Sequence, residues 1–157
     1  MPPISISPAK TSELEQLNEL MFELHNEHHL SCSEFFKSAE EIEQEKSIAR
    51  YLDDPECLVF VAKSGRKVIG FITGHFCELV SSVSKPVQMG SIDELYVTPD
   101  FRKQNVAKEL CSTLHQRFKD YGVVQVFVEV WDFNGPAKAF YQQLGFEQHI
   151  HWLRKAI

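Results

Sequence analysis

The sequence predicts a single domain of the mixed α/β (α+β) class. Its 157 residues, 43% of them hydrophobic, are enough to bury one core. Segments rich in β-branched and aromatic residues alternate with segments whose apolar residues recur at helical spacing, without internal repeats or low-complexity linkers. We therefore expect one domain over residues 1–157, with a central sheet and about four helices.

Two amphipathic helices are expected after a short strand over residues 4–7. Ser12 and Glu15 have the spacing of a capping box ahead of the first helix. Ser38 and Glu41 repeat this spacing ahead of the second helix. A capping box satisfies two backbone donors at a helix N-terminus, so both pairs predict where a helix begins.

The end of the first helix contains a pair of histidines, His25 and His29. If the helix continues, they share one face, and two histidines spaced four residues apart can bind a metal. No third ligand is evident and the order is not H-E-x-x-H. We therefore expect a surface or substrate-pocket role for these histidines and no metal site.

A β-hairpin is predicted over residues 58–74. Residues 58–62 and 68–74 are rich in strand-forming types and are joined by a short segment that contains Gly65. A serine-rich loop over residues 81–86 then leads into the next strand.

The centre of the chain is a strand followed by a basic junction and a helix. Residues 92–97 predict a buried strand, and apolar residues at helical spacing begin at Val106. Between them lies Arg102-Lys103-Gln104-Asn105, next to a helix N-terminus whose backbone N–H groups have no helical partners. Such a junction favours an anion. The alternative is an ordinary turn with a solvated Arg-Lys pair.

The last third of the sequence predicts a strand, a helix and a final strand. Residues 124–130 form a nearly continuous apolar run, typical of an interior strand covered on both faces. Asn134 and Pro136 open a helix that Gly145 closes. Residues 146–153 alternate loosely between apolar and polar types, and we expect a strand there.

The charge balance argues against two classes of partner. Twenty-two acidic and sixteen basic residues give a formal net charge of -6, which disfavours nucleic acid and an anionic membrane surface but not a cationic amine. The four cysteines form no C-x-x-C pair, and there is no signal pattern or long apolar run. We expect reduced thiols and a cytoplasmic protein.

Two segments carry a resemblance to a known family. Arg102, Asn105 and Ala107 stand at the defined places of the Gln/Arg-x-x-Gly-x-Gly/Ala signature, so the junction resembles the pyrophosphate-binding loop of the GNAT acetyltransferase superfamily. Asn105 replaces the usual glycine, and asparagine is the non-glycine residue that best tolerates a positive φ. Residues 131–146, W-D-F-N-G-P-A-K-A-F-Y-Q-Q-L-G-F, resemble the family's closing A-x-x-F-Y-x-x-x-G-F segment.

The resemblance implies a GNAT-like fold, in which two parallel strands of a mostly antiparallel sheet splay apart around acetyl coenzyme A. Main-chain groups of the central strand would bind the pantetheine, and the amides of the junction would bind the pyrophosphate. Asn134 and Tyr141 would lie near the thiol end of the cofactor. No metal is implied. The implied cofactor-binding residues are Leu95, Tyr96, Val97, Arg102, Lys103, Gln104, Asn105, Val106, Ala107, Lys108, Asn134 and Tyr141.

The chemistry of acetyl transfer to an amine requires a base and a proton donor. Asp93 matches a position where several small-amine members carry a carboxylate, Glu94 is the alternative, and water is a third. Adjacent residues of a regular strand point to opposite faces, so we expect at most one carboxylate to face the notch. Backbone N–H groups of the splayed strand would stabilise the oxyanion, and Tyr141 would protonate the leaving thiolate.

The function implied by this resemblance is acetyl transfer from acetyl-CoA to a primary amine, most simply of a small molecule. Two alternatives stay open: a protein N-terminal or lysine acetyltransferase, and a non-catalytic acyl-CoA-binding sensor. The resemblance also implies a possible homodimer.

Overall fold

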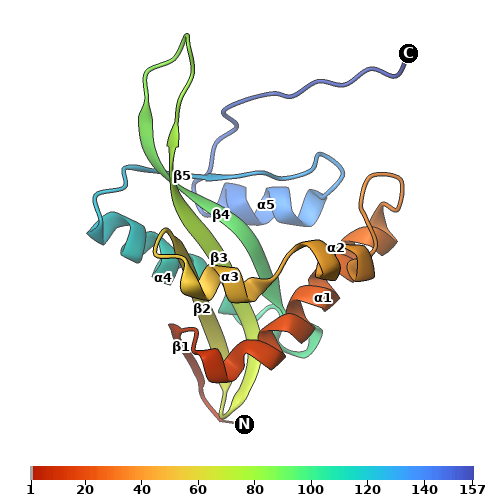
Figure 1. The fold of residues 1–157 in the computed structure, drawn as a ribbon, viewed down its shortest axis with the longest axis vertical. Coiled ribbons are helices and arrows are strands. Elements are labelled where there is room, and N and C mark those ends of the chain that lie inside the picture. The colour runs from red at the N-terminus through yellow and green to blue at the C-terminus, as the bar shows by residue number, and fades with distance from the viewer. Residues whose placement is uncertain (1) are drawn as a thin grey trace.

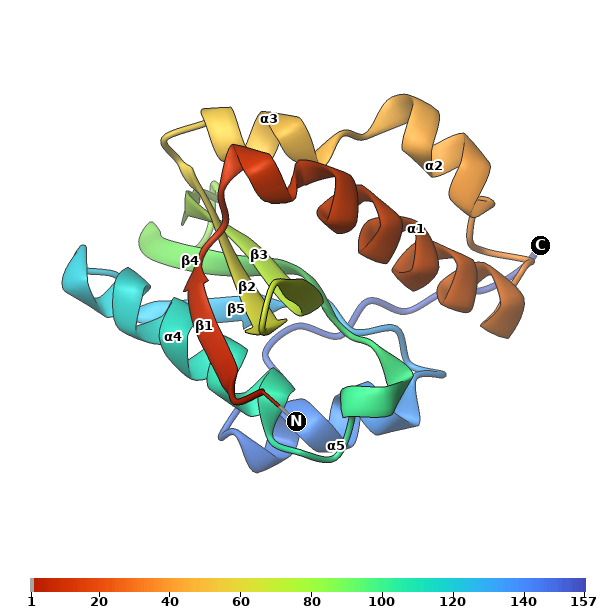
Figure 2. The same ribbon diagram turned by 90° about the horizontal axis from the view of Figure 1, so that it is seen from below.

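The fold is built on a five-stranded β-sheet with helices on both faces (Figures 1 and 2). The structure is a computed structural model and describes residues 2–157. The strands are β1 (Ile4–Pro8), β2 (Cys57–Ser64), β3 (Lys67–Leu79), β4 (Val87–Val97) and β5 (Gln125–Val128). The helices are α1 (Leu14–Ser31), α2 (Ala39–Glu45), α3 (Ile48–Asp53), α4 (Val106–Asp120) and α5 (Gly135–Gln143), with short 3₁₀ helices η1 (Thr11–Glu13) and η2 (Pro99–Phe101).

The sheet has the strand order β1-β2-β3-β4-β5. The first three pairs are antiparallel and the β4–β5 pair is parallel, as the sequence analysis predicts for a mixed, mostly antiparallel sheet. The predicted hairpin is β2–β3, and Gly65 turns it with φ +63°, a conformation that suits glycine. The long β3–β4 hairpin extends beyond the rest of the sheet and carries the predicted serine-rich loop at its tip (Figure 1).

Two apolar cores lie on opposite faces of the sheet. On one face, Leu110, Leu114 and Phe118 of α4 pack against the sheet, and α5 adds Tyr141. On the other face, the buried side of α1 packs against Phe71 and Tyr96. Each helix buries one apolar stripe, which is the arrangement that amphipathic spacing predicts.

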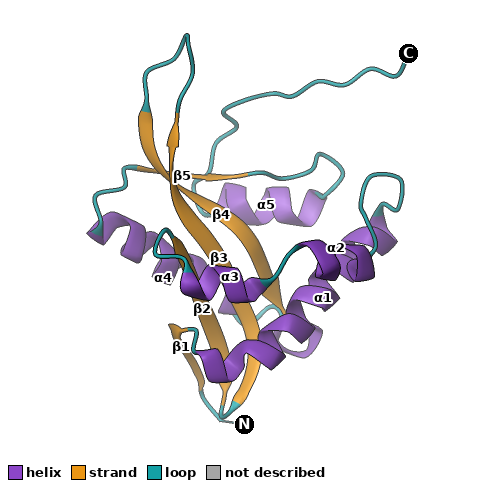
Figure 3. Cartoon of the chain, in the orientation of Figure 1, coloured by secondary structure: helices purple, strands orange, loops and turns teal. Residues whose placement is uncertain are grey.

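The last part of the chain differs from the sequence prediction. Residues 146–153 form no strand, and the chain from Gly145 to the C-terminus is a loop that leads away from the sheet (Figure 3). Trp152 is 95% exposed there. Without this strand, β5 lies at the edge of the sheet with Val124 exposed beside it, so the prediction of an interior strand is also wrong. The loose alternation of residues 146–153 is too weak a signal to specify a pairing partner.

The helices on the α1 side also depart from the prediction in two places. The first helix is not capped by Ser12, because residues 11–13 form η1 and the Glu13 carboxylate accepts from the Lys10 N–H at 2.8 Å. The second predicted helix is two helices, α2 and α3, separated at Lys46 and Ser47. The Ser38–Glu41 capping box ahead of α2 is confirmed. Among residues 2–157, no helix combines the length and apolarity that a membrane crossing requires.

Candidate active site

Strands β4 and β5 separate halfway along β4. Their ladder runs from the Met89–Gln125 pair to the Ile92–Val128 pair and goes no further. Strand β4 continues to Val97 and, apart from Asp93, stays paired with β3. Within residues 2–157, the other edge of β4 therefore has no strand partner from Asp93 to Val97. This is the splayed parallel pair that the sequence analysis predicts.

The junction between β4 and α4 takes an unusual backbone conformation. Asn105 is left-handed, with φ +64° and ψ +12°, and Lys103 also has a positive φ of +62°. In the part of the chain that the structure describes, no side chain caps the N-terminus of α4. The first-turn N–H groups of α4 are therefore free of side-chain partners and carry the positive end of the helix dipole.

Arg102 lies beside this junction but is directed toward α1 and β4. Its Nε donates to the Val97 carbonyl at 2.8 Å, its NH2 donates to a Glu27 carboxylate oxygen at 2.8 Å, and its guanidinium stacks 5.3 Å from the Tyr96 ring centre. The Tyr96 hydroxyl in turn donates to Glu23 at 3.0 Å. Arg102 thus links the end of β4 to α1, and the Val97 carbonyl already has a donor.

The other residues of the junction differ in burial and in hydrogen bonding. Gln104 donates to the Asp100 carbonyl at 3.3 Å, while Val106 is buried in the core beneath the helix. Lys103 and Lys108 are exposed. Two lysines and a row of N–H groups thus surround the turn, although the whole chain is acidic.

A β-bulge changes the expected arrangement of the two carboxylates. Thr73 pairs with Glu94 and Gly74 pairs with Ile92, so Asp93 is an extra residue on β4. As a result, both carboxylates reach groups of the α2–α3 side of the molecule. The expectation that adjacent strand residues must point to opposite faces is therefore wrong here, because it assumes a regular strand.

Glu94 is the more deeply buried of the two acids. Its side chain is 4% exposed and accepts hydrogen bonds from the Thr73 hydroxyl and from the Lys46 ammonium. Lys46 comes from the break between α2 and α3, and its ammonium also lies 5.6 Å from the centre of the Tyr51 ring. A buried carboxylate is stable only with such partners.

Asp93 has a separate set of partners. One oxygen lies 2.6 Å from His75 Nδ1 and accepts from the Tyr51 hydroxyl at 3.2 Å, and the other accepts from the Ser91 hydroxyl at 3.0 Å. Burial and the two nearby carboxylates raise the pKa of Tyr51, so this phenol remains a proton donor at neutral pH. His75 is half-exposed and connects Asp93 to solvent.

Asn134 and Tyr141 hold the positions that α5 gives them. The Asn134 side-chain oxygen accepts from the Ala137 N–H at 3.2 Å and caps the helix. The Tyr141 ring packs edge-on against Phe140 and Phe146, with centroids 5.1 and 5.3 Å away. Burial, and then the neighbouring Cys111 thiol, raise the pKa of Tyr141, so its hydroxyl stays protonated.

Several residues of this region carry no sequence signal. Lys46, Tyr51, Thr73 and His75 belong to no motif. The register of β3 against β4 brings Thr73 and His75 to the carboxylates, and the packing of the α2–α3 segment on the sheet brings Lys46 and Tyr51 there. Phe36 from the α1–α2 loop meets Trp131 from the β5–α5 loop, with ring centroids 4.8 Å apart. These contacts join different segments of the chain, which spacing within one segment cannot reveal.

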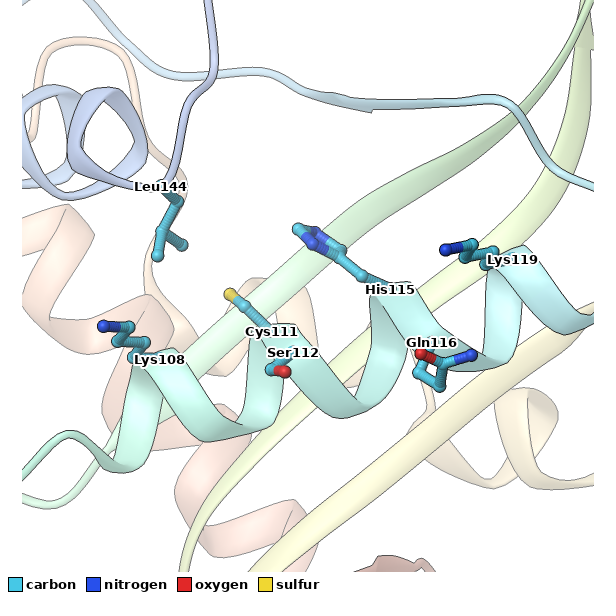
Figure 4. Close-up of a pocket in the computed structure, with 7 residues that line it drawn as sticks. All are labelled: Lys108, Cys111, Ser112, His115, Gln116, Lys119 and Leu144. Carbon is cyan, nitrogen blue, oxygen red and sulfur yellow. The ribbon is translucent and has the colours of Figure 1, made fainter.

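A cavity of about 310 Å³ lies between α4 and the C-terminal end of α5 (Figure 4). Lys108, Cys111 and His115 of α4 face Leu144 across it. None of Asp93, Glu94 and Tyr141 lines this cavity, so it is separate from the carboxylates on β4. In residues 2–157, no group of three or more His, Cys, Asp or Glu side chains is arranged to hold a metal ion.

The chain matches known proteins over most of its length. The sequence model of the acetyltransferase (GNAT) family matches residues 19–146. An acetyltransferase of known crystal structure from Vibrio fischeri is 53% identical, covers 81% of this chain and 96% of its own, and has a TM-score of 0.68. The structure of AAC(6')-Iy in complex with the bisubstrate analogue CoA-S-monomethyl-acetylneamine is 20% identical over 99% of each chain, with a TM-score of 0.70, and shows a likeness of fold.

A curated relative, an uncharacterized N-acetyltransferase of Methanocaldococcus jannaschii, is 32% identical over 100 residues, which are 60% of this chain and 42% of that protein. The match thus spans about two fifths of the relative's length. The family model, in contrast, spans most of the present chain and includes β4, the left-handed junction and α5. The protein therefore belongs to the GNAT acetyltransferase family.

Proposed function

We propose that this protein is an acetyl-CoA-dependent N-acetyltransferase that acts on a primary amine of a small cationic molecule. The observation that supports this most directly is the separation of β4 from β5 beyond Ile92, next to the left-handed turn at Asn105. The solved structure of AAC(6')-Iy, in complex with the bisubstrate analogue CoA-S-monomethyl-acetylneamine, supports this proposal.

The residues present fit an acetyl-CoA molecule. The unpaired edge of β4 at Leu95 offers main-chain groups to the pantetheine amides, as an added strand would. The N–H groups at Val106, Ala107 and Lys108 fit the pyrophosphate, because the left-handed Asn105 directs the start of an uncapped helix toward it. We assign Lys103 and Lys108 a supporting electrostatic role.

The two carboxylates divide the acid–base work in this proposal. Glu94 orients the substrate ammonium, since it already binds one ammonium, that of Lys46. Asp93 accepts the proton that the amine must lose and passes it through His75 to solvent. An alkylammonium has a pKa near 10.4, so this deprotonation must precede attack at neutral pH.

The remaining steps use the main chain of β4 and the hydroxyl of Tyr141. The thioester supplies the acyl group to the neutral amine. Backbone N–H groups at the unpaired edge of β4 donate to the carbonyl oxygen as negative charge develops there. Tyr141 then donates its proton to the sulfur as the carbon–sulfur bond breaks, and the proton that the nitrogen loses on amide formation restores the Tyr141 hydroxyl.

The test is release of free thiol from acetyl-CoA with a panel of polyamines, aminoglycosides, amino acids and peptides. We expect turnover with small cationic amines and a large loss of kcat in Asp93→Asn. Turnover with peptides alone would favour a protein acetyltransferase. Tight acetyl-CoA binding without turnover on any amine would favour the acyl-CoA-binding sensor.

A further inference from the structure

Lys46 occupies the place that the proposed mechanism gives to the substrate ammonium. It follows the last residue of α2, in the break before α3, and its backbone is extended with φ -128° and ψ 126°. From there its side chain reaches across to β4 and its ammonium hydrogen-bonds the buried Glu94 carboxylate. Lys46 thus contributes a primary amine of this chain at the proposed amine site.

The surroundings of Lys46 suit an amine that reacts. Its side chain is 38% exposed, so it is not locked in the core. The centre of the Tyr51 ring lies 5.6 Å from the Lys46 ammonium, and the Tyr51 hydroxyl donates to Asp93, so Tyr51 contacts both the Lys46 amine and the second carboxylate. Burial, and then the nearby Lys46 and His28, lower the pKa of His25, so His25 adds no positive charge beside Lys46 at neutral pH.

Glu94 also lies next to the proposed acyl site. It is two residues beyond Ile92, where β4 and β5 separate, and it directly precedes Leu95. Lysine carries its ammonium on a flexible four-carbon stem, so the nitrogen can leave the carboxylate by rotation of side-chain bonds.

We propose that Lys46 is acetylated by its own chain when acetyl-CoA is bound and no amine substrate is present. The Lys46 ammonium gives one proton to Asp93, its nitrogen forms an amide bond with the acetyl carbon, and the carbon–sulfur bond breaks. The thiolate takes a proton from Tyr141, and the second proton that the nitrogen loses as the amide forms returns Tyr141 to its protonated state, so free CoA and acetyl-Lys46 are the products. This inference rests on the proposed function and adds a modification site to it.

The modification would change the site in a predictable way. The acetylated nitrogen has no charge, so Glu94 loses its cation and the acetyl group stands where the substrate ammonium would bind. We expect acetyl-Lys46 protein to turn over amines more slowly than unmodified protein. An amine substrate present from the start should protect Lys46 by competing for Glu94.

Lys37 is a matched control within the same chain. It also pairs with a glutamate, Glu45, at 2.7 Å, but its side chain is 56% exposed and this partner belongs to α2 instead of β4. Chemical acetylation by acetyl-CoA in solution should therefore favour Lys37. Enzymatic acetylation at the proposed site should favour Lys46.

The experiment incubates the purified protein with acetyl-CoA alone and follows each lysine by peptide mass spectrometry. We expect Lys46 to be acetylated about a hundredfold faster than Lys37, at a rate independent of protein concentration, because general-base catalysis contributes about that factor or more. Asp93→Asn should remove the preference. Equal rates at Lys46 and Lys37, or a preference that survives in Asp93→Asn, would overturn the inference.

Lys46→Arg separates this inference from the proposed function. Arginine keeps the cation on Glu94 but has no reactive amine. If Lys46→Arg releases thiol with amines while Lys46 of the native protein stays unmodified, self-acetylation is rejected and the proposed function stands. No thiol release by either protein with any amine would reject both.

Discussion

Asn105 offers the sharpest test of the junction between β4 and α4. Its φ of +64° lies in the left-handed region, which costs most L-residues about 1–2 kcal/mol. Asparagine tolerates this conformation and glycine adopts it freely. We therefore expect Asn105→Ala to lose about 1–2 kcal/mol of unfolding free energy relative to Asn105→Gly. For a chain of this size, that difference corresponds to a melting temperature lower by roughly 2–8 °C.

The same pair of variants should differ in their affinity for acetyl-CoA. If alanine turns the junction away from the left-handed conformation, at least one N–H at the start of α4 no longer points at the pyrophosphate. A hydrogen bond to a charged group contributes about 1.5–3 kcal/mol, so KM for acetyl-CoA should rise about tenfold or more in Asn105→Ala. Asn105→Gly should keep or improve the native KM.

The measurements are calorimetric unfolding without ligand and steady-state kinetics at saturating amine. Gln104→Ala is the control, because it removes only an adjacent exposed side chain with a long, 3.3 Å hydrogen bond to the Asp100 carbonyl, keeps the backbone N–H, and lies where φ is not positive. It should change neither the melting temperature nor KM appreciably. If the alanine and glycine variants of Asn105 match each other in both quantities, the left-handed conformation has no role in stability or in cofactor binding.

Three further predictions concern the catalytic hydroxyl, the core and the pH dependence of stability. Tyr141→Phe should lower kcat about a hundredfold or more while KM for acetyl-CoA changes little, and an unchanged kcat would remove this hydroxyl from the mechanism. Gly90→Ala should lower the unfolding free energy by about 1–3 kcal/mol in denaturant titrations, because a β-carbon there would lie 2.6 Å from the buried Phe118 ring. Gly135→Ala is the control and should cause no such loss, since a β-carbon there would meet open space. Burial, followed by the charges of Lys46 and His28, lowers the pKa of His25 in the folded protein to about 4. As the pH falls below 6.5, His25 therefore binds a proton in the unfolded chain before it does so in the folded protein, and the folded protein loses stability. Between pH 7 and pH 5, His25→Gln should therefore lose about 1 kcal/mol less unfolding free energy than the native protein, after allowance for partial solvent screening. Equal losses in the two proteins would refute this cause.

The parts of the site that the sequence predicts are those that local chemistry determines. A strand, a basic turn and an amphipathic helix follow one another from Ile92 to Leu110, and the choice of asparagine at position 105 already indicates a positive φ. The Ser38–Glu41 capping box is likewise a contact between residues three positions apart. Such features depend on a few neighbouring residues, so their pattern is visible without the fold.

The arrangement of the carboxylates depends on the register between two strands, which the sequence does not display. One extra residue in β4 opposite Thr73 and Gly74 brings Asp93 and Glu94 to the same side. A regular strand of the same composition would place the two carboxylates on opposite faces of the sheet. The regular and the bulged strand have the same hydrophobic pattern, so the sequence does not distinguish them. The C-terminal strand fails for a related reason, since weak alternation in residues 146–153 specifies no partner.

The helix break before α3 shows how a local feature acquires a distant role. Ser47 accepts from the Ala49 N–H at 3.2 Å, which starts α3 and leaves Lys46 extended. In a continuous helix, the Lys46 side chain would follow the helical face that its position dictates. The break frees the Lys46 side chain from that constraint. It points toward Glu94 on β4, because a buried carboxylate without a partner would be costly. The reactivity that we propose for Lys46 therefore depends on two separate facts, a serine cap at the start of α3 and a bulge in β4.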